Sequence, residues 1–322
     1  MMFLWVGYAD GWRNEDLERI NMDELTTKRL AVIKQLYLHG IEQSYEVEPM
    51  NGFSILSFHD SVEMFMKLCA EKRGIKIGRD VNFGDYFSIL PDLQCNATMT
   101  TLNSKRVGLK HYGALPSKLD IEISRANVMD FFEHNTPIYF DVQFNEISLV
   151  SLIKYNSVRN YMNRALSDLS HNQYKDSITN SQIAFMELMW CYEMENTIHF
   201  ESILGKSWSF SSQSSFHLKM GLGRDFDSFI ENVSESIPLL EERLDIIGLG
   251  IDYLRYRKFK LLSPSIEMWQ DEKGEDKYYV FIDEERDRRI CSHKNAQFCF
   301  DFVVESALKL QRFNVDINET IE

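Results

Sequence analysis

An arginine and a histidine, Arg106 and His111, stand five positions apart in the stretch LNSKRVGLKHYGALP, Leu102–Pro116. Histidine titrates near neutral pH, so it can accept or deliver a proton during a reaction. Arginine keeps its charge and presents several N–H donors to phosphate oxygens. RNA cleavage without a metal needs a base for the 2′-hydroxyl, an acid for the leaving 5′-oxygen and a cation for the phosphorane. These two residue types can supply all three roles.

The spacing alone does not single out this pair, because about one such match is expected by chance in a chain of this length. Arg164 also precedes His171, and both Arg286 and Arg288 precede His293. The first of these pairs ends a predicted helix and faces a loop. The others lie in the charged connection EERDRRICSHKN. We interpret both as solvated charges.

Amphipathic patterns predict the helices that would hold Arg106 and His111. In the first half of the chain we expect two long helices, a short one, the helix that carries the pair and a further long one, over 23–48, 54–72, 86–90, 98–112 and 120–134. The first two are joined by a tight turn and should form an antiparallel hairpin. Four long helices are a natural count for a bundle.

Helix geometry limits how the pair can act. Five steps of about 100° place Arg106 and His111 about 140° apart on a straight helix. They cannot both point at one phosphate from one regular helix face. A distortion at Gly108 would help. We favour a groove between two bundles, where each phosphate meets groups from both; the second bundle is either a second subunit or the C-terminal half of the same chain.

The stretch resembles the ribonuclease motif of the HEPN superfamily (higher eukaryotes and prokaryotes nucleotide-binding domain). In that family an arginine is followed after four to six residues by a histidine, within a late helix of a four- or five-helix bundle. Several bacterial branches show similar flanking residues, here Asn103, Lys110, Gly113 and Pro116. The resemblance covers about 23–134 and implies a homodimeric endoribonuclease with a composite site. Val107 is a departure, since members often carry a polar residue after the arginine.

The second half is predicted to be another helical domain. We expect helices over 158–169, 174–192 and 295–312, a long helix that carries 240–254 and ends in YLRYRKFKLLSP, and a β-hairpin near 266–282. We place the boundary where TPIYFDVQF, Thr136–Phe144, looks like a strand or linker, so that the domains are 1–135 and 136–322. The Ser-rich segment Gly205–Ser215 is expected to be mobile.

The stretch YLRYRKFKLLSP in the second half ends in the same way as the motif. Counting back from its proline, Phe259 stands in the place of the histidine. The second domain is therefore either a degenerate HEPN-like copy or a domain with an ordinary basic helix end. In both cases three basic residues would form a patch for RNA: Arg255, Arg257 and Lys258.

Composition and charge narrow the classes of function that remain. A net charge of −14 excludes bulk electrostatic attraction to nucleic acid, so any RNA contact must be local. Near the motif we expect Asn103, Lys105 and Lys110 to make such contacts. Five cysteines without paired spacing indicate reduced thiols and no zinc site. No signal peptide or apolar run of about 20 residues is recognised, which predicts a cytoplasmic protein without membrane contact.

The sequence thus predicts an all-α protein in which a HEPN-like bundle is followed by a second helical domain with a small β-hairpin. The function we expect is that of a metal-independent endoribonuclease without cofactor, acting on RNA as a toxin or anti-phage defence effector. A homodimer and an antitoxin or defence partner protein are implied by the resemblance. The alternative is a catalytically silent HEPN-like module that binds a nucleotide or a partner protein.

Overall fold

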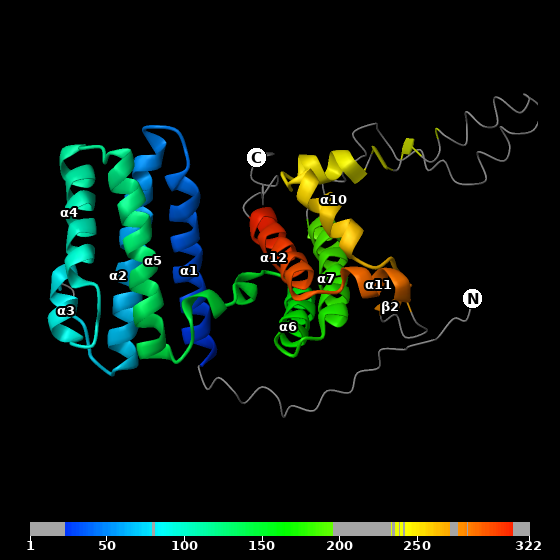
Figure 1. Ribbon diagram of the computed structural model, residues 1–322, viewed down its shortest axis with the longest axis horizontal. Coiled ribbons are helices and arrows are strands. Elements are labelled where there is room, and N and C mark those ends of the chain that lie inside the picture. The colour runs from blue at the N-terminus through cyan, green and yellow to red at the C-terminus, as the bar shows by residue number, and fades with distance from the viewer. Residues whose placement is uncertain are drawn as a thin grey trace, which may run out of the picture. The chain divides into compact units, whose positions relative to one another are not determined.

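The structure is a computed structural model that describes residues 23–78, 81–195, 242–270, 276–281 and 283–311, with a few positions between 233 and 240. The segment Gly205–Ser215, for which mobility was predicted, lies outside these residues. The chain divides into two compact units, 8–152 and 153–322 with 1–7, and each is described by itself. The fold is all-α with a small antiparallel hairpin, as predicted (Figure 1).

The unit 8–152 is a helical bundle. Its elements are α1 (Glu24–Ser44), α2 (Ser54–Lys72), the short α3 (Tyr86–Ile89), α4 (Asn96–Tyr112) and α5 (Lys118–Phe140). Figure 1 shows α1, α2, α4 and α5 as neighbouring rods. The two caps follow from sequence: the Asp23 carboxylate accepts from the N–H of Thr26 at 2.9 Å, and Ser117 with Asp120 forms a capping box at the start of α5.

Aromatic rings fill the centre of this bundle. Phe65 of α2 meets Phe131 and Phe132 of α5 edge to face, with ring centroids 5.6 and 5.4 Å apart. Tyr37 of α1 meets Phe132 at 5.5 Å in the same way. Edge-to-face packing of this kind adds to the burial of large apolar side chains. The core therefore joins α1, α2 and α5 and leaves α4 on the flank of α2 and α5.

The strand interpretation of Thr136–Phe144 is wrong. Helix α5 continues to Phe140, and 3₁₀ turns at Phe144–Glu146 and Val150–Leu152 follow it. Thr136, Tyr139 and Phe140 are all buried, which is the three-and-four spacing of a helix face. Their packing outweighs the helix-breaking tendency of Pro137. The compact unit ends at Leu152, so the division falls later in the chain than the 135/136 boundary that was expected.

The unit that contains 153–322 is built around one long helix. Its described elements are α6 (Asn156–Ser170), α7 (Tyr174–Glu195), α10 (Tyr253–Leu262), β1 (Ile266–Gln270), β2 (Asp276–Val280), α11 (Glu284–Ile290) and α12 (His293–Leu310). Phe185 of α7, Phe259 of α10 and Phe302 of α12 share one cluster, with ring centroids 4.7–5.5 Å apart. The two strands pair antiparallel with Ile266 opposite Val280.

Two local predictions for this unit need correction. The one long helix expected from 240 into YLRYRKFKLLSP is interrupted, because Gly250 adopts a φ of +68° and the carboxylate of Asp252 caps a new helix, α10, at the N–H of Arg255. The charged connection before the last helix contains the helix α11, which Asp283 caps. An aspartate marks the start of each of these helices. The pattern of apolar residues alone does not reveal either helix start.

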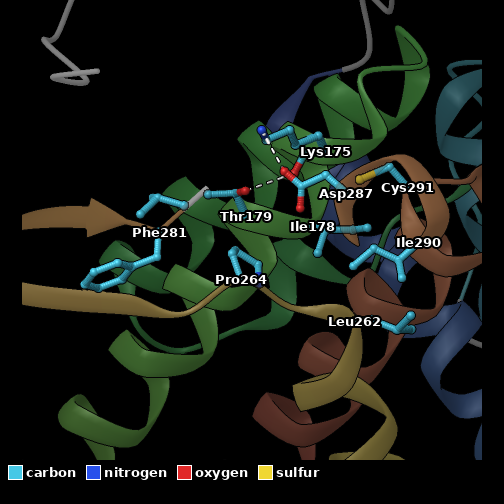
Figure 2. A pocket seen from close by; sticks show the side chains of 10 residues that line it. Lys175, Ile178, Thr179, Leu262, Pro264, Phe281, Asp287, Ile290 and Cys291 are labelled. Atoms are coloured by element: carbon cyan, nitrogen blue, oxygen red, sulfur yellow. Dashed lines mark hydrogen bonds and ion pairs between the residues drawn. The ribbon is translucent and has the colours of Figure 1, made fainter. Parts of the chain in front are cut away.

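Helix α11 and the hairpin lie against α7 around a small cavity. Figure 2 shows Lys175 of α7 paired with Asp287 of α11, and their charged atoms are 2.8 Å apart. The space beside them, lined also by Phe281 and Cys291, is about 10 Å³. That is room for one water molecule at most, so this cavity is part of the packing. In the described part of the chain, no helix has the length and apolar character needed to cross a membrane.

Candidate functional site

Arg106 and His111 both lie on α4, which runs without interruption from Asn96 to Tyr112. The distortion that was considered at Gly108 is therefore not found. The helix ends where Gly113 adopts a φ of +65° and its N–H donates to the carbonyl of Leu109 at 3.1 Å. Five positions on a regular helix put the two side chains on different faces. One copy of α4 does not bring them together.

Arg106 is half-buried on the face of α4 that is turned toward α2. Its charge acts on His59 and Glu63 of α2, because it lowers the pKa of both groups. Asn103 lies one turn earlier, and its side-chain oxygen is 3.1 Å from Nε2 of His59. No hydrogen bond or ion pair ties the guanidinium of Arg106 to any residue in the described ranges. Its donors are thus available to a ligand.

His59 is the buried centre of this face. Its side chain is 3% exposed, and its ring stacks on Phe83 with centroids 4.4 Å apart. Burial is the largest cause that lowers its pKa below 6.5, and the charge of Arg106 lowers it further, against the opposing effect of Asp60 and Glu63. At neutral pH this histidine is therefore uncharged. Nε2 of the ring faces the side-chain oxygen of Asn103, and Nδ1 faces the carboxylate of Asp60, so both ring nitrogens have a polar neighbour.

Two carboxylates of α2 complete the cluster. Nδ1 of His59 is 3.3 Å from Asp60 and 3.9 Å from Glu63. Burial works to raise the pKa of Glu63, but a 2.6 Å hydrogen bond from Lys67 and the nearby positive charges lower it overall. Of the residues that the structure describes, these three form the group with metal-ligand types in one place, within 4.8 Å of one another. Glu63 is already bound to Lys67, and we assign no metal here.

The other expected ligands on α4 divide into two kinds. Lys105 is bound to the carboxylate of Asp120 on α5. This hydrogen bond, together with those that Ser117 donates to the same carboxylate, lowers the pKa of Asp120 to about 2. Lys105 therefore joins two helices and is not free for RNA. Lys110 and His111 are exposed in the last turn of α4, on the solvent side.

The basic patch expected on α10 lies in the other unit. Arg255 is paired with Glu305 of α12. The amine of Lys258 is 3.8 Å from the centroid of the Phe298 ring, a cation–π contact. Arg257 is exposed. One of the three charges is thus neutralised by an internal pair, and the remaining patch is smaller than the sequence suggests.

His59 was not among the site residues expected from the sequence. The residue falls within the buried stripe of α2, between Phe58 and Val62, where a polar residue needs a partner. A histidine on an apolar face, in a chain with an Asn-x-x-Arg pair on another helix, was the available signal.

A scan against family models and searches of curated proteins and of solved structures found no match to this chain.

Proposed function

We propose that the chain is a metal-independent endoribonuclease of HEPN type, in which Arg106 stabilises the phosphorane and His111 transfers protons. The observation that carries this proposal is the state of Arg106. It is half-buried, has no hydrogen bond or ion pair with a described residue, and lies beside a histidine that burial keeps neutral. A guanidinium held in this way is suited to bind a phosphate oxygen with two N–H donors.

In this proposal each residue has one task. His111, exposed at the end of α4, takes the proton of the 2′-hydroxyl or delivers one to the 5′-oxygen. Arg106 neutralises charge as the phosphorane forms. Asn103 and His59 form a hydrogen-bonded pair beside Arg106, and the charge of Arg106 helps to keep His59 neutral. The toxin or anti-phage role, a cytoplasmic location and an antitoxin or defence partner belong to the same proposal and rest on the family resemblance.

A catalytically silent module is the second candidate. One observation favours it: Arg106 and His111 lie on different faces of one regular helix. Such a module would bind RNA, a nucleotide or a partner protein through Arg106 without cutting anything.

The test uses purified full-length protein and a labelled RNA with EDTA present. We expect cleavage that EDTA leaves unchanged and that leaves a 2′,3′-cyclic phosphate. Arg106→Ala and His111→Ala should each lower the cleavage rate at least 100-fold, because general acid–base catalysis typically contributes about 10²–10⁴. The matched control is His134→Ala, an exposed histidine on α5. RNA binding with no cleavage would establish the silent module, and cleavage by His111→Ala at the wild-type rate would remove His111 from the mechanism.

A further inference from the structure

A hydrogen bond between side chains joins α2 to α4 one turn before Arg106. Nε2 of His59 lies 3.1 Å from the side-chain oxygen of Asn103. Because an amide oxygen can only accept, this contact is a hydrogen bond when Nε2 carries the ring proton. The ring is almost fully buried and stacks on Phe83, so it has little room to turn. His59 thus holds a donor at a fixed point beside the Asn103 side chain.

The other possible position for the ring proton is Nδ1, which lies 3.3 Å from the carboxylate of Asp60. The side chain of Asp60 is 58% exposed, so water can solvate its carboxylate without help from His59. The oxygen of Asn103 faces a buried ring and has less access to water. An unpaired acceptor costs more when it is buried than when it is exposed, so the proton is favoured on Nε2.

The contact with His59 also sets the direction of the Asn103 amide. An amide carries an oxygen that accepts and a nitrogen with two N–H donors. When the oxygen faces His59, the nitrogen is directed away from the ring. Asn103 is half-buried, and among the residues that the structure describes none accepts a hydrogen bond from this nitrogen. Its N–H groups are therefore available to a ligand.

Arg106 follows Asn103 by three positions, which makes the two side chains neighbours on the surface of α4. The carboxylate of Glu63 is held by Lys67 through a 2.6 Å hydrogen bond. Asp60 and Glu63 together bring two negative charges to this face, and Lys67 and Arg106 balance them. A ligand must therefore be bound by directed hydrogen bonds and not by net charge. Phosphate oxygens accept such bonds, so a guanidinium beside amide N–H donors suits a phosphate.

We propose that His59 is a positioning residue for RNA: it holds the oxygen of Asn103, and an N–H group of Asn103 binds the same backbone phosphate as Arg106. This inference rests on the proposed ribonuclease function and deepens it, because it names a second contact to the phosphate. Without the donor of His59 the amide can turn over and present its oxygen, which repels a phosphate. His59 itself does not touch the RNA.

The position of the ring proton is measured by NMR on the full-length chain without RNA. In a neutral histidine the ¹⁵N shifts of the two ring nitrogens show which one is protonated. We expect the proton of His59 on Nε2, and the loss of its signals in His59→Gln assigns them. A proton on Nδ1 would overturn the proposal, because the Asn103 oxygen would then have no donor.

RNA binding is measured with a 2′-O-methyl oligonucleotide, which has no 2′-hydroxyl and so is not cleaved by the proposed reaction. His59→Gln places an amide N–H near the position of Nε2 and should keep the wild-type affinity. His59→Leu removes the donor and should weaken binding about ten-fold or more, the usual effect of losing a hydrogen bond to a charged group. As the control, Ser57→Ala removes a 2.6 Å hydrogen bond from α2 to Gln43 of α1 and should leave the affinity unchanged.

A double variant shows whether His59 acts through Asn103. Asn103→Ala should itself weaken binding about ten-fold or more, and His59→Leu should add nothing in that background. A merely structural His59 would change the melting temperature and leave the affinity intact. The proposal is overturned if the wild type does not bind the oligonucleotide, if His59→Leu keeps the wild-type affinity, or if the two losses add.

Failure of the ribonuclease proposal gives a different result. The wild type would then bind the 2′-O-methyl oligonucleotide but leave unmodified RNA uncut, and the binding series would still decide the role of His59.

Discussion

At Arg106 a permanent positive charge lies beside a histidine that is almost completely buried. The two side chains compete electrostatically, because each proton taken up by His59 brings a second positive charge next to the guanidinium. The hydrogen bond between His59 and Asn103 holds the ring in place in its neutral form. The cluster thus keeps His59 uncharged beside Arg106, whose guanidinium has no hydrogen bond or ion pair with a described residue.

The pKa of His59 should rise when that charge is removed. In the Arg106→Gln variant we expect the pKa to move up from its lowered value, toward 6.5 without reaching it, since burial remains the larger cause. The measurement is an NMR titration of the ring proton signals of the histidines. Lys110→Gln, which removes an exposed charge on the same helix, should leave the pKa of His59 unchanged.

The same shift has a consequence for stability. A histidine whose pKa is lowered on folding takes up a proton more readily in the unfolded chain. His59 therefore stabilises the fold above about pH 6.5, and this contribution is lost as the pH falls below that value. Arg106→Gln should lose less stability between pH 6.5 and 5 than the wild type does. An equal loss in both proteins would show that the two groups are not coupled.

Residue types and spacing named Arg106, His111 and Asn103 as candidates, but they did not show which residues these side chains meet. Asn103 and Arg106 share a face of α4 because they are three positions apart. The hydrogen-bond partner of Asn103, His59, is 44 positions earlier and belongs to another helix. Contacts of that range depend on how α2 and α4 pack, which no local pattern contains. The same holds for Lys105, whose partner Asp120 is on α5.

Among the elements, α4 shows how differently two glycines can behave. Gly108 lies within the regular helix, and a Cβ added there would meet its nearest neighbour, the side chain of Ala114, at 3.9 Å, an ordinary contact. Gly113 has a φ of +65°, which an L-amino acid with a Cβ adopts only with strain. The first glycine is replaceable, and the second ends the helix.

Substitution by alanine should therefore have opposite effects at these two positions. Gly108→Ala should stabilise the chain by about 0.5–1 kcal/mol, the difference in helix propensity. Gly113→Ala should destabilise it by about 1–2 kcal/mol through backbone strain. Urea unfolding followed by circular dichroism measures both. RNA cleavage by Gly108→Ala should equal that of the wild type; a loss of cleavage would mean that α4 must bend at Gly108 to act.

Helices with a clear apolar stripe were predicted well, and α2 matches its predicted range at both ends. The errors occurred where short polar signals compete with the apolar pattern. In α5 the stretch around Ile138 was expected to be a strand or linker, yet burial of Tyr139 and Phe140 in the core keeps the segment helical. Before α10, Gly250 and Asp252 end one helix and start another within an uninterrupted apolar pattern.

At the scale of the whole chain, Phe259 bears on the question whether the second unit is a degenerate copy of the first. In the alignment of the two stretches it corresponds to His111. Phe259 is fully buried and packs against Phe185 and Phe302, whereas His111 is exposed in the last turn of α4. The two positions thus have opposite environments. A histidine at position 259 would lie in an apolar core, so we do not expect the second unit to supply a catalytic residue there.

This favours a second subunit as the source of the opposite half of the site. A symmetric dimer uses the same surface twice, so it would contain two sites, each with Arg106 from one chain and His111 from the other. That arrangement resolves the angular separation of the two residues on α4. A mixing experiment can distinguish this site between subunits from a site within one chain.

Mixing Arg106→Ala chains with His111→Ala chains should restore cleavage. Each variant alone has only incomplete sites, but in a mixed dimer one of the two sites receives both wild-type residues. An equal mixture contains about half mixed dimers, each with one complete site of two, so about a quarter of the wild-type activity should return. The measurement is RNA cleavage after the two variants have been incubated together long enough to exchange subunits. As a control, the double variant Arg106→Ala/His111→Ala mixed with wild type should leave mixed dimers inactive, because each of their sites lacks one residue. If the two single variants stay inactive together while subunit exchange is demonstrated, Arg106 and His111 act within one chain or do not form a site.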